Sequence, residues 1–145
     1  MGIRRQAREA ALQALYLADV AKMPIEDAIL SAGTGSELPD KAGEFGVLLA
    51  RGAADVRPEL DQTIMKYAEN WELHRMAAVD RNILRLAAYE LLHYADTPVS
   101  VVIDEAVEIA KRYSTQDSGK FVNGILDKIK LDRPDASSRN GDSPA

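Results

Sequence analysis

The chain contains no cysteine among its 145 residues, which excludes disulfide bonds, thiol nucleophiles and thiolate-held metal sites. Histidine is almost absent as well. The only two, His74 and His93, are not spaced as a pair of metal ligands with acidic residues nearby. We therefore expect no bound metal ion.

Long apolar runs are also missing. No stretch approaches the roughly 20 residues that a membrane-spanning helix needs. The N-terminal arginines precede a segment rich in Ala and Leu, as in a secretion signal. However, Glu9, Gln13 and Asp19 recur in that segment at helical intervals, so it reads as an amphipathic helix. These absences predict a cytoplasmic protein that does not contact a membrane.

Two motifs of enzyme active sites are absent too. Gly33 and Gly35 do not form a phosphate-binding loop, because no strand precedes them and no Gly-Lys-Ser/Thr follows. The Gly-x-Ser-x-Gly pattern of hydrolases does not occur, although spacing alone leaves a Ser-His-Asp arrangement open. We expect no catalytic residue and no cofactor, and a protein that works by binding other macromolecules.

What is present is the composition of a folded domain, with 46% hydrophobic and 28% charged residues. The net charge of -5 argues against a non-specific nucleic-acid coat. Three arginines nevertheless fall within the first eight residues, with no acid before Glu9. A local basic patch can bind phosphates on an acidic protein, because the field of one face matters more than the total charge.

The hydrophobic pattern predicts an all-α fold, a compact bundle of about seven helices, and shows no convincing strand. The expected helices cover approximately residues 4–22, 25–32, 41–56, 58–67, 79–94, 98–113 and 117–129, with one short turn at 71–76. Segment 79–94 is apolar nearly all round and should be the buried centre. Thr97 and Pro98 should cap and open the next helix. We expect a domain over residues 1–131 and a disordered tail over 132–145.

The first helix carries residues suited to RNA. At 100° per residue, Arg5, Arg8 and Tyr16 fall within roughly 80° of one another. Guanidinium groups grip phosphates, and an aromatic ring offers a surface for an unstacked base. The alternative is that Tyr16 belongs to the core and the arginines only solubilise the terminus.

Gly124 interrupts the otherwise regular last helix. Glycine inside a helix costs about 1 kcal/mol relative to alanine, so its presence needs a reason. It points about 160° away from Val122, the centre of the apolar stripe, and shares that outer half with Lys120 and Phe121. A glycine there would let a phosphodiester or a partner backbone approach closely. The alternative is that Phe121 folds into the core and the glycine accommodates a neighbouring helix.

The carboxylates look structural. Glu105 and Glu108 share a helix with Lys111 and Arg112, which indicates a solvated face with salt bridges at helical spacing. Asp80 begins the central helix, where the helix dipole favours an acid, so a capping role is the first interpretation. A salt bridge from Asp80 to a partner protein is the other.

Several ordered stretches together resemble the NusB family of bacterial transcription antitermination factors. They are RRQARE and QALY in the first helix, VDRNILRL and YEL in the central helix, DEA at 104–106, and DSGKFVNGILD at 117–127. The resemblance extends over residues 3 to 129 and is weakest between 23 and 72. The basic run is shorter here than in the family, because Gln6 interrupts it.

The resemblance implies two small helical subdomains packed across each other. It also implies binding of boxA, a short single-stranded signal in ribosomal RNA leader transcripts, together with NusE, the ribosomal small-subunit protein ten. Both proteins would join the RNA polymerase elongation complex. The RNA-binding residues it implies are Arg4, Arg5, Arg8, Gln13, Tyr16, Asp117, Lys120 and Phe121. The partner-binding residues it implies are Asp80, Arg81 and Leu84.

Two other interpretations stay open. The same helical module occurs at the N-terminus of some ribosomal RNA cytosine methyltransferases, although this sequence carries no Gly-rich cofactor motif. The chain could also be a structural homodimer in which the arginine, tyrosine and phenylalanine faces contact each other.

Overall fold

The computed structural model describes residues 2–69 and 71–134, and this part of the chain is helical with no strand. The α-helices are α1 (Ile3–Val20), α2 (Ile25–Ala32), α3 (Asp40–Asp55), α4 (Arg57–Tyr67), α5 (Ala78–His93), α6 (Val99–Tyr113) and α7 (Gln116–Ile129). Two short 3-10 turns, η1 (Leu73–Arg75) and η2 (Lys130–Asp132), complete the described elements. The all-α prediction is confirmed. No helix in the described ranges is long and apolar enough to cross a membrane.

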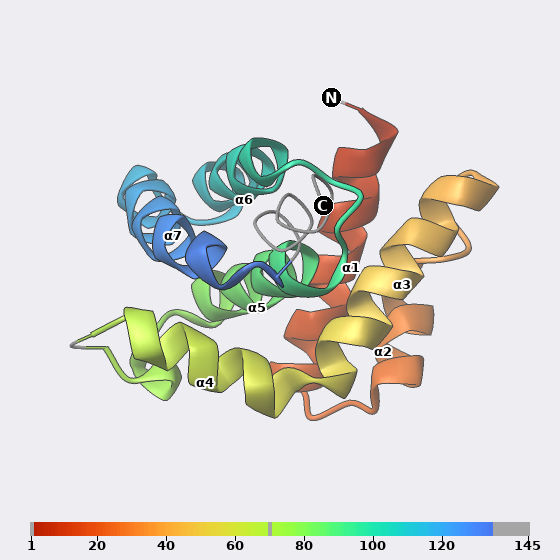
Figure 1. Ribbon diagram of the computed structural model, residues 1–145. Helices are drawn as coiled ribbons and strands as arrows, with labels where there is room; N and C mark the ends of the chain where they lie inside the picture. Colours follow the sequence, from red (N-terminus) through yellow and green to blue (C-terminus); the bar gives the residue numbers. More distant parts are fainter. Residues whose placement is uncertain (1, 70, 135–145) are drawn as a thin grey trace.

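The helices form two groups that meet along α5 (Figure 1). Helices α2 and α3 pack against α1, while α6 and α7 pack against each other. Helix α5 contacts α1, α3, α4, α6 and α7, so it touches both groups. Ile83, Leu84 and Leu91 on α5 are at most 1% exposed. The segment that is apolar nearly all round is therefore the centre of the fold, as its pattern predicts.

Local sequence explains most helix ends. Gly33 adopts a left-handed φ of 66° and ends α2, a conformation that glycine reaches at little cost. The Thr115 hydroxyl accepts a hydrogen bond from the Ser118 amide at 3.0 Å and caps α7. The prediction that Thr97 caps α6 is wrong. Pro98 occupies the cap position itself, and no side chain bonds the first turn of that helix.

The first residues after α7 are also structured. The buried Arg133 side chain donates hydrogen bonds to the carbonyls of Thr97 at 2.8 Å and Tyr94 at 3.3 Å. Residues 132–134 therefore belong to the folded domain and not to the expected tail. The rest of the expected tail, residues 135–145, lies outside the described residues.

A buried acid joins α1 to α5. Asp19 near the end of α1 is 5% exposed and accepts hydrogen bonds from Arg81 at 2.7 Å and from Asn82 and Arg85 at 2.9 Å. Burial raises the pKa of Asp19, but the bonds from Arg81 and Asn82 and the charge of Arg85 outweigh it and hold this pKa well below its usual range. This cluster fixes the end of α1 on the start of α5.

Candidate nucleic-acid interface

The three N-terminal arginines occupy different environments although they lie within five residues. Arg4 is exposed, and its guanidinium carbon lies 4.0 Å from the centroid of the Phe45 ring on α3. This cation–π contact lays one side of the guanidinium on the Phe45 ring, while the residue as a whole stays exposed. Arg4 is thus available to a phosphate.

Arg5 is held by a carboxylate of α6. Its Nε and Nη2 donate to the two Glu105 oxygens at 2.6 and 2.9 Å, with both side chains about one-fifth exposed. The hydrogen bond from Arg5 is the main reason that the pKa of Glu105 is lowered. Glu105 therefore does not lie on a solvated face as expected, but clamps an arginine expected to bind RNA.

Arg8 lies inside the protein. Its Nε and Nη2 donate to Glu90 Oε1 at 2.9 Å and Oε2 at 2.6 Å, and the two side chains are 6% and 1% exposed. Arg8 cannot reach an RNA phosphate without leaving the Glu90 charge buried and unpaired. Its assignment to the RNA surface is therefore corrected: three positions after Arg5, the helix has turned this side chain onto α5.

Gln13 and Tyr16 line one hollow on the face of α1. The hollow has a volume of about 550 Å³, and Val79 of α5 and Tyr113 of α6 contribute to its wall. Gln13 is exposed and Tyr16 half-buried. Tyr16 therefore fits both alternatives, the core residue and the RNA contact. Part of its side chain packs on the protein and part faces the hollow.

Lys120 and Phe121, two of the predicted residues of α7, line a second hollow of about 340 Å³. Lys120 is exposed, and the half-buried Phe121 meets Trp71 edge-to-face with ring centroids 5.7 Å apart. A Cβ added to Gly124 would meet nothing within 4 Å, so the glycine faces open space as its position predicts. Asp117 is exposed in the first turn of the same helix.

Hydrogen bonds form a junction between the starts of α5 and α7 and the end of α6. Ser118, at the start of α7, bonds the Asp80 carboxylate at 3.0 Å and the Ser114 hydroxyl at 2.8 Å. Asp80 follows Val79 of the first hollow, and Ser114 follows Tyr113. Lys120 and Phe121 of the second hollow come two and three residues after Ser118. Ser118 thus fixes the start of α7 against α5 and α6.

The predicted partner residues are largely internal. Leu84 is completely buried in the core, so its assignment as a partner contact is corrected. Asp80 lies in the first turn of α5, where the dipole favours it, but it makes no capping bond and instead accepts from Ser118. Its other oxygen is buried without a hydrogen-bond partner among the described residues. Only Arg81 is partly exposed, while bound to Asp19.

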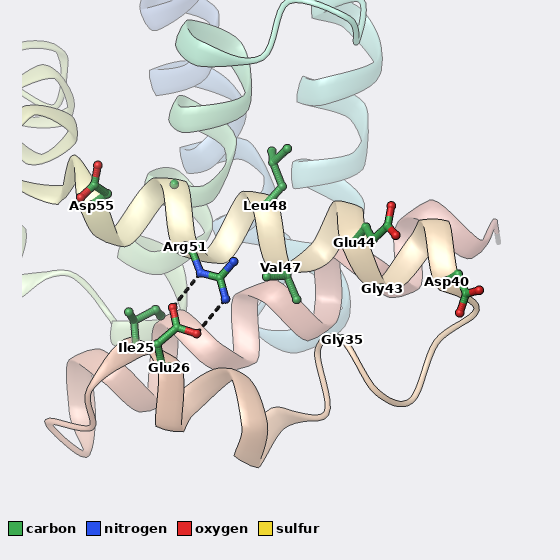
Figure 2. A pocket seen from close by; sticks show the side chains of 11 residues that line it. Ile25, Glu26, Gly35, Asp40, Gly43, Glu44, Val47, Leu48, Arg51 and Asp55 are labelled. Carbon is green, nitrogen blue, oxygen red and sulfur yellow. Dashed lines mark hydrogen bonds and ion pairs between the residues drawn. The ribbon is translucent and has the colours of Figure 1, made fainter.

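A hollow larger than these two lies elsewhere, between α2 and α3, and none of the predicted residues lines it (Figure 2). Its volume is about 1100 Å³, and the Arg51 guanidinium crosses it to bind Glu26 at 2.7 Å. Asp40, Glu44 and Asp55 also line it. Four carboxylates against one arginine in its lining disfavour phosphate binding in this hollow.

Sequence reasoning missed Trp71, the only tryptophan, which completes the wall of the second hollow. A large aromatic residue in a polar segment was the signal that could have marked it.

For metals, the described ranges hold no cluster of three or more His, Cys, Asp or Glu residues that could coordinate an ion.

Comparisons with known proteins agree with one another. The sequence model of the NusB family matches residues 5–130. The chain is 50% identical over 135 residues to the transcription antitermination protein NusB of Elusimicrobium minutum, covering 92% of this chain and 96% of that protein. It is 48% identical over 134 residues to the protein of the same name from Symbiobacterium thermophilum, covering 87% of this chain and 88% of that one.

Solved structures show the same similarity. NusB of T. maritima superposes with a TM-score of 0.86 at 40% identity, covering 94% of this chain and 96% of that one. A crystal structure of the antitermination factors NusB and NusE in complex with dsRNA contains a chain that superposes with a TM-score of 0.81 at 28% identity. This match covers 89% of the present chain and 96% of that one.

Proposed function

This chain belongs to the NusB family, and we propose that it is a transcription antitermination factor that binds boxA RNA together with NusE and joins the RNA polymerase elongation complex. The observation that carries the proposal is the match to a solved NusB in complex with NusE and RNA, at a TM-score of 0.81. In this role the protein is a binding adaptor of the bacterial cytoplasm and not an enzyme. The matched relatives are named antitermination proteins, which disfavours the methyltransferase interpretation.

The proposed RNA surface follows α1 and α7. Arg4 supplies an exposed charge for phosphates, and Gln13 supplies hydrogen-bonding groups for a base or sugar. Lys120 is exposed and makes no ion pair among the residues that the structure describes, so it too can bind a phosphate. Tyr16 and Phe121 offer ring surfaces at the two hollows on which unstacked bases can pack.

Arg5 joins this surface conditionally. It can bind a phosphate only by leaving Glu105, so RNA and this carboxylate compete for one guanidinium. Asp117 at the start of α7 is exposed and adds a negative charge to the same face, which opposes non-specific binding of phosphates. Both features predict weak binding by the protein alone and tighter binding once NusE contributes further contacts.

The proposed partner surface centres on the start of α5. Arg81 is the predicted partner residue that retains exposure, and Asp80 supports this region by fixing Ser118 and the first turn of α7. Ser118 lies within one helical turn of Lys120 and Phe121 on α7, so NusE bound at this junction would lie close to the proposed RNA residues of that helix.

The test is fluorescence anisotropy of a labelled boxA RNA against a scrambled RNA of equal length, with and without NusE. We expect preferential binding of boxA that tightens when NusE is added. Equal binding of the two RNAs, or no binding even with NusE, would overturn the proposal. Sedimentation of the same samples tests the homodimer interpretation, which requires a dimer that RNA neither binds nor dissociates.

A further inference from the structure

The chain turns sharply after α4 and presents Trp71. Glu69 adopts a left-handed φ of 33°, and the Trp71 amide donates to the Ala68 carbonyl at 3.0 Å, which closes the turn. The Trp71 side chain meets Phe121 of α7 with the two rings inclined at 69°. Trp71 nevertheless remains 51% exposed, so this contact fixes one edge of the indole and leaves much of its surface open to solvent.

The surroundings of this aromatic pair are basic and accessible. Lys120 and Lys128 line the same hollow from α7. Lys128 lies 3.7 Å from Glu69, but both side chains are more than half exposed, so the attraction between them is weak. Gly124, between the lysines in sequence, leaves its side of the hollow open. The volume of about 340 Å³ falls within the range of roughly 300–1,000 Å³ typical of small-ligand sites.

Other exposed apolar side chains lack this setting. Leu30 on α2 is 76% exposed, yet it lines none of the hollows described here. Single exposed apolar residues of that kind are ordinary and need no functional reason. An exposed indole beside a second ring, two ammonium groups and an open backbone is instead the combination that binds single-stranded nucleic acids.

We infer that Trp71 and Phe121 form a stacking cleft for one unpaired nucleobase, whose neighbouring phosphate binds Lys120 or Lys128. The inference rests on the proposed RNA-binding function and extends it to a residue that the predicted site does not include. Stacking on an indole tolerates any base, because every base has a π-face. The cleft therefore adds affinity and fixes the path of the strand along α7, while sequence discrimination lies elsewhere.

The protein contains its own reporter for this cleft. Trp71 is the only tryptophan of this chain beside five tyrosines, so excitation at the red edge of indole absorption observes this residue alone within the chain. The experiment titrates the full-length chain with boxA RNA and records Trp71 emission and the anisotropy of the labelled RNA in parallel, with and without NusE. We expect saturable quenching whose midpoint coincides with that of the anisotropy change.

Three variants complete the test. Trp71→Ala should weaken RNA binding roughly 5- to 150-fold, the range expected for loss of one stacked base, without changing the salt dependence. Trp71→Phe should recover most of that loss. Leu30→Ala is the matched control, since it removes an exposed apolar side chain outside the cleft and should bind as the wild type does. Circular dichroism confirms that each variant folds.

The readouts separate this inference from the proposed function. One outcome is that anisotropy shows RNA binding, Trp71 emission does not change and the Trp71→Ala variant binds with wild-type affinity. This outcome would overturn the cleft and leave the proposed function intact. Quenching by NusE alone, unaffected by RNA, would assign Trp71 to a protein contact and also overturn the cleft. Absence of any anisotropy change with NusE present would overturn both.

Discussion

Arg5 and Arg8 show how strongly the environment of a residue decides its role. One helical turn separates them, and both bind a carboxylate through two nitrogens. The Arg5 pair with Glu105 is partly exposed, whereas the Arg8 pair with Glu90 is enclosed. Exchange with a phosphate is therefore open to Arg5 and closed to Arg8.

This difference makes a prediction about single substitutions. Arg8→Ala should lower the free energy of unfolding by about 3–5 kcal/mol, because it leaves the Glu90 charge buried without a partner. Arg5→Ala should cost about 1 kcal/mol or less, since its pair is partly solvated. Urea unfolding followed by circular dichroism measures both. Similar losses for the two variants would contradict the distinction.

A second prediction at this scale concerns Glu105. Glu105→Gln keeps the shape of the side chain but removes the charge that holds Arg5. We expect tighter RNA binding and a steeper dependence on salt, because a freed guanidinium adds up to one phosphate contact and about 0.7 to the slope for single-stranded RNA. Glu108→Gln on the same helix is the control. An affinity equal to the wild type would show that Arg5 does not exchange.

At the scale of elements, α7 retains a glycine that its own stability does not favour. Gly124→Ala adds a methyl group that meets no atom within 4 Å and should stabilise the protein by up to about 1 kcal/mol. If the open backbone serves RNA, the same variant binds RNA more weakly. Thermal unfolding and anisotropy measure the two effects. Ser100→Ala, on an exposed position of α6, controls for a general change in helix stability. If the variant is more stable and binds RNA with unchanged affinity, then Gly124 does not contact the RNA.

The elements were largely predictable from sequence because their signals are local. Gly33, the prolines and the 3.6-residue apolar repeat place α2 and α5 within a residue of their observed bounds. The partners of Asp19 and Arg8 were not predictable. An amphipathic pattern assigns charged residues to the surface, and it does not indicate which residues distant in sequence come into contact. Arg8 was therefore placed on the wrong side of α1, while Gly124 and Lys120 were placed correctly.

For the whole molecule, the Asp19 cluster predicts acid sensitivity. The folded-state pKa of Asp19 lies below its ordinary value, so at low pH the unfolded chain binds a proton that the folded protein does not. This contribution to stability is complete above about pH 4 and is lost as pH falls towards the folded-state pKa. Urea unfolding from about pH 7 to about pH 3 should show the decline. Asp19→Asn should be less stable at neutral pH and less sensitive to acid, and equal slopes for both proteins would contradict the assignment.

The position of α1 in the chain also has a consequence for synthesis. Helix α1 is synthesised before the residues that bind it, because Arg81, Glu90 and Glu105 follow their α1 partners by 62, 82 and 100 residues. At about 5–20 residues per second, the last of these partners is made on the order of 5–20 s after Arg5. During that interval Arg5 and Arg8 of a nascent α1 lack the Glu105 and Glu90 carboxylates that bind them in the folded protein. They are then more open to nucleic acid and chaperones near the ribosome, so a nascent α1 presents a more basic surface than the folded helix does.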